Sequence, residues 1–72
     1  MVIQTRFGFG EVVWFLRGSM VDKGCVFSIN VDVRYEGVKV KYTIQYSEDC
    51  GVELEEDKVF GSEEEAEAYG NR

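Results

Sequence analysis

Apolar and polar residues alternate along the middle of the chain, from Gly24 to Tyr46, and the alternation is interrupted once, at Tyr35-Glu36-Gly37. Because successive side chains of a strand point to opposite faces, this pattern predicts two antiparallel strands joined by a tight turn. Gly37 can adopt the positive φ that short hairpin loops require. We expect one set of side chains to face the core: Cys25, Phe27, Ile29, Val31, Val33, Val38, Val40, Tyr42, Ile44 and Tyr46. The alternate set is expected to face outward: Val26, Ser28, Asn30, Asp32, Arg34, Lys39, Lys41, Thr43 and Gln45.

A near-continuous apolar run from Val12 to Arg17 predicts another strand before this hairpin. One parity of so short a strand must supply the core, and we expect Val13 and Phe15 to do so. Trp14 then lies outside or at the rim.

Glycines are expected to bend the chain at two places. Phe7-Gly8-Phe9-Gly10-Glu11 predicts a turn whose two phenylalanines close one end of the core. Asp22-Lys23-Gly24 predicts a bend or bulge, shortly after the next strand has begun at Met20-Val21. Val2-Ile3 is expected to form a short strand in the N-terminal lead-in.

The segment after the hairpin predicts one more strand and an apolar plug. Ser47 to Gly51 is a polar turn, and the alternation of Val52 to Glu55 predicts a strand with Val52 and Leu54 inward. Val59-Phe60 is expected to close the other end of the core through a single helical turn.

A short helix is expected at the C-terminus. Ser62 and Glu65 match the capping box S-x-x-E, and acids in the first turn suit the positive end of the helix dipole. The helix is expected to run to about Tyr69 and to stop at Gly70. A helix of this length is marginal alone, so we expect it to dock through Ala66 and Tyr69.

Together these elements predict a mainly β fold. We expect a single domain over residues 1–72, with about five antiparallel strands in a core at about 7–60 and an acidic helix at about 62–70. A chain of 72 residues buries only about 60% of its unfolded surface, so self-association is a reasonable expectation.

Charge is divided unevenly along the chain. Residues 1–47 carry six bases and four acids, whereas residues 48–72 carry two bases and ten acids, which gives the net charge of −6. An acidic protein repels phosphate backbones at long range. The balance therefore disfavours non-specific binding to nucleic acid or to anionic membranes.

Two cysteines and no histidine leave little for metal or redox chemistry. We expect Cys25 to be a buried thiol rather than half of a disulfide with Cys50. No stretch resembles a signal peptide or approaches the ~20 apolar residues of a membrane span. The sequence predicts a cytoplasmic protein with no cofactor, no metal, no membrane association and no small-molecule substrate.

The order of these motifs resembles that of SH3-like small barrels of the Tudor or KOW type. The resemblance rests on FGFGEVVWFL, GCVFSINV, VKYTIQY and GVELEEDKVFGSEEEAEAY, which cover most of the chain from Phe7 to Tyr69. The closing E-x-x-x-V-F-x-S-x-E-E-A is also similar to the end of short uncharacterised proteins of bacteriophages and other mobile elements. The resemblance implies a barrel that binds methylated side chains, proline-rich peptides or RNA, with Trp14 and Tyr46 at the positions of an aromatic cage.

We interpret the chain as a non-catalytic binding module. The expected binding residues are Trp14, Tyr46, Arg34, Lys39 and Lys41, because aromatic and cationic side chains together suit either a protein partner or a single nucleic-acid strand. A protein partner or self-association is the favoured interpretation, and a nucleic-acid-binding barrel is the alternative.

The acidic C-terminal third supports another alternative, an acidic decoy. Glu63, Glu64 and Glu65 form the expected acidic surface, which would mimic the charge of DNA and occupy a DNA-binding protein.

Overall fold

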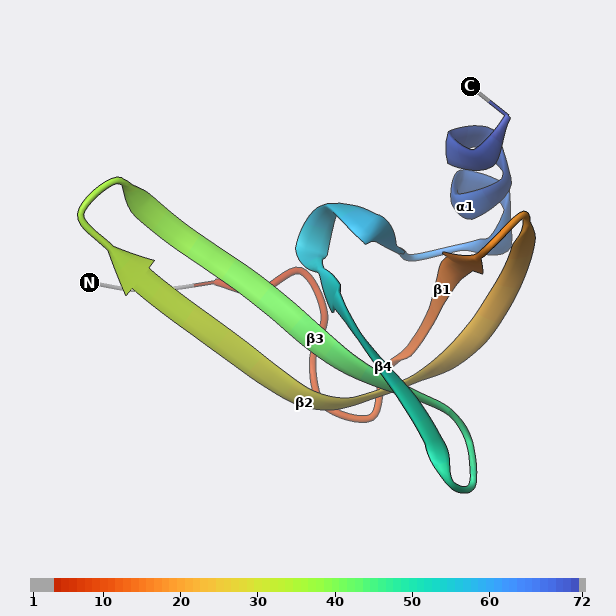
Figure 1. Cartoon of the computed structure of the whole chain (residues 1–72), viewed down its shortest axis with the longest axis horizontal. Coiled ribbons are helices and arrows are strands. Elements are labelled where there is room, and N and C mark those ends of the chain that lie inside the picture. Colours follow the sequence, from red (N-terminus) through yellow and green to blue (C-terminus); the bar gives the residue numbers. More distant parts are fainter. Residues whose placement is uncertain (1–3, 72) are drawn as a thin grey trace.

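A computed structural model describes residues 4–71 as one antiparallel sheet followed by a short helix (Figure 1). The elements are β1 (Val12–Arg17), β2 (Met20–Arg34), β3 (Gly37–Ser47), β4 (Cys50–Glu55), a 3-10 turn (Glu56–Lys58), β5 (Val59–Phe60) and α1 (Glu63–Gly70). The five strands are arranged in the order β4-β3-β2-β1-β5. This confirms a small, mainly β fold with five antiparallel strands and a short C-terminal helix. The strand expected at Val2-Ile3 lies outside the described residues.

The first four strands form a meander, and β5 returns to its start. Each of β1, β2 and β3 pairs with the next strand along the chain, and β5 pairs with β1 through Trp14–Phe60 and Phe15–Val59. Gly18 and Gly37, in the first two turns, have φ values of +65° and +145°, which favour glycine. The single helical turn before Val59 is present as predicted, and Val59 and Phe60 themselves form a strand.

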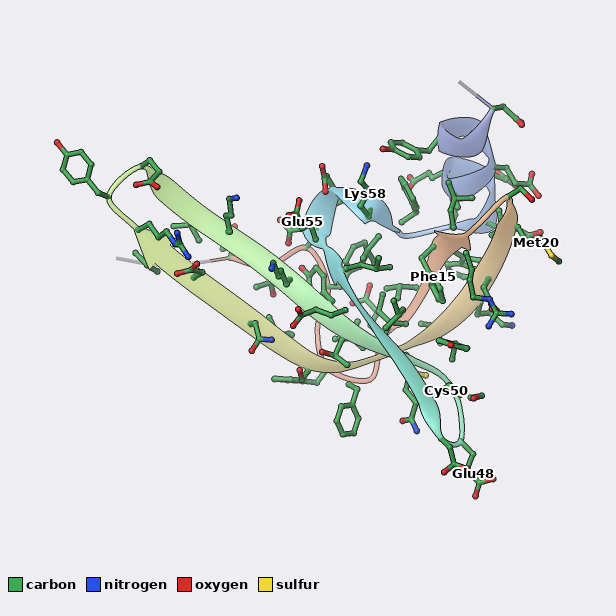
Figure 2. All side chains as sticks on the ribbon, viewed as in Figure 1. Phe15, Met20, Glu48, Cys50, Glu55 and Lys58 are labelled. Carbon is green, nitrogen blue, oxygen red and sulfur yellow. The ribbon has the colours of Figure 1, made fainter. Side chains whose placement is uncertain are left out.

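A small core fills the concave side of this sheet. Its fully buried side chains come from three strands, as expected for Val13 and Phe15 of β1 and for Tyr42 and Ile44 of β3. Figure 2 shows Phe15 directed into this interior. The partly buried residues that pack against the core are Ile29, Val40, Tyr46, Val52 and Leu54. The inward facing predicted for β4 is therefore confirmed.

The facing predicted for the start of the hairpin is wrong. Val26 lies opposite Ile44 and Ser28 lies opposite Thr43, so Phe27 has no partner and forms a β-bulge. An extra residue reverses the alternation of side chains. Val26 is therefore buried, whereas Phe27 is 67% exposed, and Cys25 is an exposed free thiol rather than a buried one.

A bend or bulge was expected at Asp22-Lys23-Gly24. Strand β2 continues through these residues without interruption, and the bulge lies three residues after Gly24, at Phe27. A Cβ atom at this glycine would lie 2.6 Å from the carbonyl oxygen of Gln45 and 2.7 Å from Cγ2 of Ile44. The missing side chain lets β2 approach β3 closely just before the bulge.

The helix covers the outer side of β1 and β5. The Ser62 hydroxyl accepts a hydrogen bond from the backbone N–H of Glu65 at 3.2 Å, which confirms the predicted cap. Ala66 is fully buried, and the ring of Tyr69 lies 5.2 Å from that of Phe60. The predicted docking residues are therefore correct, and the helix extends to Gly70.

Tyr42 connects the segment before β1 to the 3-10 turn after β4 through two hydrogen bonds. The phenol of Tyr42 accepts a hydrogen bond from the backbone N–H of Phe7 at 3.3 Å and donates one to the Glu56 carboxylate. Burial, followed by this carboxylate, raises the pKa of Tyr42 above its usual value of 10.0. Phe7 closes the core as predicted, but Phe9 is 73% exposed, since the turn directs it outward.

Candidate interaction surface

The two expected cage aromatics lie on opposite faces of the sheet. Trp14 is half-buried and lies opposite Lys23 and Phe60, on the side that α1 covers. Tyr46 packs on the core side, with its ring 5.8 Å from that of Phe15 and 4.9 Å below the guanidinium of Arg17. Trp14 and Tyr46 therefore do not form a common aromatic site.

The expected cations lie on the outer face of the β2–β3 hairpin, each beside a polar or acidic neighbour. The Nε atom of Arg34 lies 2.8 Å from Oδ2 of Asp32, and Lys39 lies opposite the same aspartate. Lys41 lies between Asn30 on β2 and Glu55 on β4. These three cations are far along the hairpin from β1, so they do not combine with Trp14 into a nucleic-acid platform.

The three acids of the first helical turn stay exposed. Of these, Glu65 accepts a hydrogen bond from the backbone N–H of Gly61 at 3.2 Å. Glu63 and Glu64 remain at the surface, as expected of a solvated helix face.

The most conspicuous surface feature is the outer half of the β2–β3 hairpin, which projects beyond its neighbours (Figure 1). Strand β1 pairs with β2 only as far as Cys25, and β4 pairs with β3 only from Lys41 onward. Residues 30–40, which we call the arm, are therefore a two-stranded ribbon. The radius of gyration of 12.5 Å exceeds the ~11 Å expected for a compact chain of this length, as a projecting arm requires.

One side of the arm is a continuous apolar surface. Val31 lies opposite Val40 and Val33 lies opposite Val38, and these four residues continue the core-facing row that begins at the pair of partly buried Ile29 and buried Tyr42. We call them the valine face. Val31, Val33 and Val38 are 40%, 51% and 44% exposed, so the prediction that they belong to the core is wrong.

The tip of the arm carries a fully exposed aromatic side chain. Tyr35 occupies the turn, and its relative exposure reaches 105%. An aromatic ring with a phenolic hydroxyl is a common anchor in protein interfaces. The valine face and Tyr35 together form the strongest candidate interaction surface of residues 4–71.

The sequence reasoning missed this surface because the alternation is the same in the core and in the arm. The expected lengths of the strands could have revealed this surface. The strands expected beside the hairpin have six and four residues, too few to cover arms of about ten. The outer part of the hairpin had to extend past them.

A second apolar patch lies on the outer face, beside the bulge. It contains Phe27, Val12 and Cys25, and Val12 lies directly opposite Cys25. A hollow of about 240 Å³ next to Phe27 is lined by residues of β3, of β4 and of the turn between them, from which Glu48 projects (Figure 2).

Both cysteines are free and exposed. Strand β3 separates Cys25 from Cys50, because Gln45 pairs with Cys25 on one side and with Gly51 on the other. Two strand spacings are roughly 10 Å, which is longer than a disulfide can bridge. The expectation that the two cysteines are not joined is consistent with this separation.

Within residues 4–71, no group of three or more histidine, cysteine, aspartate or glutamate side chains could hold a metal ion. None of the helices described there is long and apolar enough to cross a membrane. Comparisons with protein-family models, with curated proteins and with solved structures find no match to this chain.

Proposed function

We propose that the protein is a non-catalytic interaction module that binds another protein chain through its arm. The observation that carries the proposal is the exposed valine face, which ends at the exposed ring of Tyr35. Beta-branched side chains on a strand are stiff and lose little entropy on binding. Burying apolar surface of this kind is the main favourable term in protein association.

The proposal also includes the fold relationship of the protein and the kind of genetic element to which it belongs. A meander of four strands with a fifth strand beside the first supports a relationship to SH3-like small barrels. The similarity of the C-terminal motif to short proteins of bacteriophages and mobile elements supports an accessory role in such an element, in the cytoplasm. Fold alone does not define a partner, so the binding assignment rests on the arm.

Binding of nucleic acid receives less support. Arg34 is already paired with Asp32, Lys41 adjoins Glu55, and the whole chain carries a charge of −6. Nucleic-acid binding of the electrostatic type needs several cations free to neutralise phosphates.

A pull-down from a lysate of the source organism, with and without nuclease, tests the proposal. The arm variant combines Val33→Thr with Val38→Thr, because threonine has the shape of valine and keeps its preference for strands. The matched control is Val12→Thr, since Val12 is a strand valine with a similar exposure of 45%.

We expect a nuclease-resistant protein to be retained by the natural chain and by Val12→Thr but lost from the arm variant. Retention that disappears with nuclease would overturn the proposal in favour of nucleic-acid binding. Retention lost only when Glu63, Glu64 and Glu65 are changed to glutamine would instead support the acidic decoy.

A further inference from the structure

We infer that the occupant of the valine face is a second copy of this chain, bound with the two arms antiparallel and with Tyr35 of each copy at the base of the other arm. The inference rests on the proposed function and specifies its partner. Three features of the arm support it: the uniformity of the valine face, a hollow at the base of the arm, and the register of the strands.

The valine face of one copy is complementary to the valine face of a second copy. Its four members are one residue type in two cross-strand pairs, Val31–Val40 and Val33–Val38, so a two-fold rotation superimposes one pair on the other. An interface between identical copies related by a two-fold axis must be self-complementary in this way. No charged side chain belongs to this face, because Asp32, Arg34 and Lys39 alternate to the opposite side. The valines of two copies can therefore pack on one another without a charged side chain between them.

The base of the arm offers a place for one side chain. A hollow of about 240 Å³ lies where β4 ends, and its lining residues are Val38, Lys39, Val40, Glu55, Glu56 and Asp57. Pockets for small-molecule ligands start at about 300 Å³, so this hollow is better suited to a single side chain. Its valines suit the ring of a tyrosine, and its carboxylates can accept the hydrogen bond of a phenol.

The register brings Tyr35 to this hollow. The centre of the valine face is level with the pair Asp32–Lys39, and Tyr35 follows three positions beyond it. On the other side of that centre, toward the base of the arm, Glu55 pairs with Lys41, which follows Lys39 by two positions along β3. When two arms lie antiparallel about their centres, the tip of one therefore falls level with the end of β4 in the other.

The dimer is expected to be weak and concentration-dependent. Two short ribbons and two tyrosines form an interface at the low end of the size range, below about 1,200 Å² in total. Sedimentation velocity of the full chain from about 1 µM to about 1 mM covers the range in which such interfaces dissociate.

The experiment compares the natural chain with Tyr35→Ser, with the Val33→Thr and Val38→Thr double variant, and with the Val12→Thr control. We expect the natural chain and the control to form dimers with the same dissociation constant. Each arm variant is expected to weaken the dimer at least tenfold while its circular dichroism stays native, because all of these side chains are substantially exposed.

A mixture of isotope-labelled and unlabelled chains then tests the arrangement by filtered NMR. Contacts between the ring protons of Tyr35 in one copy and the methyl groups of Val38 or Val40 in the other would support it. A dimer that survives both arm variants, or one without these contacts, would overturn the inference.

The two proposals fail separately. A natural chain that stays monomeric at the highest concentration overturns the second copy as partner. If it still retains another protein in an arm-dependent way, the interaction module stands and its partner is a different chain. An arm-dependent dimer supports both proposals.

Discussion

Replacing Ile44 by alanine is expected to destabilise the fold severely, whereas Phe27→Ala is expected to have little effect. From the hairpin pattern alone, both residues belong to the core and both substitutions should cost on the order of 2–5 kcal/mol. The structure separates them, because Ile44 is fully buried and Phe27 is 67% exposed at the bulge.

The expected magnitudes follow from this burial. Ile44→Ala removes three buried carbon groups at about 0.8 kcal/mol each, and the cavity that remains adds a further cost, for a total of about 3–5 kcal/mol. A domain of 72 residues has a free energy of unfolding of about 4–11 kcal/mol. The loss is thus a large fraction of the total. Phe27→Ala leaves the core packing unchanged, and we expect about 1 kcal/mol or less.

Urea unfolding monitored by circular dichroism measures both variants against the natural chain. The slope of the free energy with denaturant should be unchanged, so that a shift in midpoint reports stability alone. Equal destabilisation by the two substitutions, or a larger effect of Phe27→Ala, would refute the bulge and the facing of β2 that follows from it.

Two other expectations concern the Tyr42 network and the close approach at Gly24. Because the pKa of Tyr42 is raised in the folded state, its stabilising contribution is complete below pH 10.0 and is lost as the pH rises through the folded pKa. Tyr42→Phe should remove this part of the alkaline loss in urea titrations at several pH values. It should also cost about 1–3 kcal/mol at neutral pH, because the N–H of Phe7 loses its acceptor; an alkaline profile unchanged by the substitution would contradict the network. Gly24→Ala should lower stability by about 1–3 kcal/mol through overpacking, since its Cβ would lie 2.6 Å from a carbonyl oxygen. Gly51→Ala is the control, because its nearest neighbour would be 3.4 Å away, and equal melting temperatures of these two variants would contradict the close approach.

The sequence alone predicted correctly those features of the fold that depend on one local rule. The alternation of β1 correctly placed Val13 and Phe15, because a strand beside a core can bury only one parity. The cap at Ser62 was predictable because a side chain three residues from its partner suffices to form it. The docking of Ala66 followed from the shortness of the helix.

The bulge was not predictable in the same way. Val26 and Phe27 are both apolar, so the pattern is compatible with either facing across this pair. The structure makes the choice through the pairing of Val26 with Ile44 on the neighbouring strand, which is a tertiary contact. Once the bulge is placed, the exposure of both Cys25 and Phe27 follows.

The candidate surface was misjudged because a strand's periodicity reports that one face is apolar, not what covers that face. Val31, Val33 and Val38 follow the same rule as Ile29 and differ only in lying beyond the ends of β1 and β4. Charge pairs could not be read from the pattern either, because the ion pair of Arg34 with Asp32 joins two side chains that the alternation places on one face without saying that they meet.

The projecting arm also determines how freely this chain can change in length. Residues added to or removed from the end of the hairpin in cross-strand pairs would leave the register of the core strands intact, whereas the same change in β1 would displace Val13 or Phe15. An even number of positions per strand preserves which side is apolar. The arm of residues 30–40 can therefore serve as an adjustable extension on a fixed body, with its reach and contact area set in steps of roughly 7 Å for each two residues of strand.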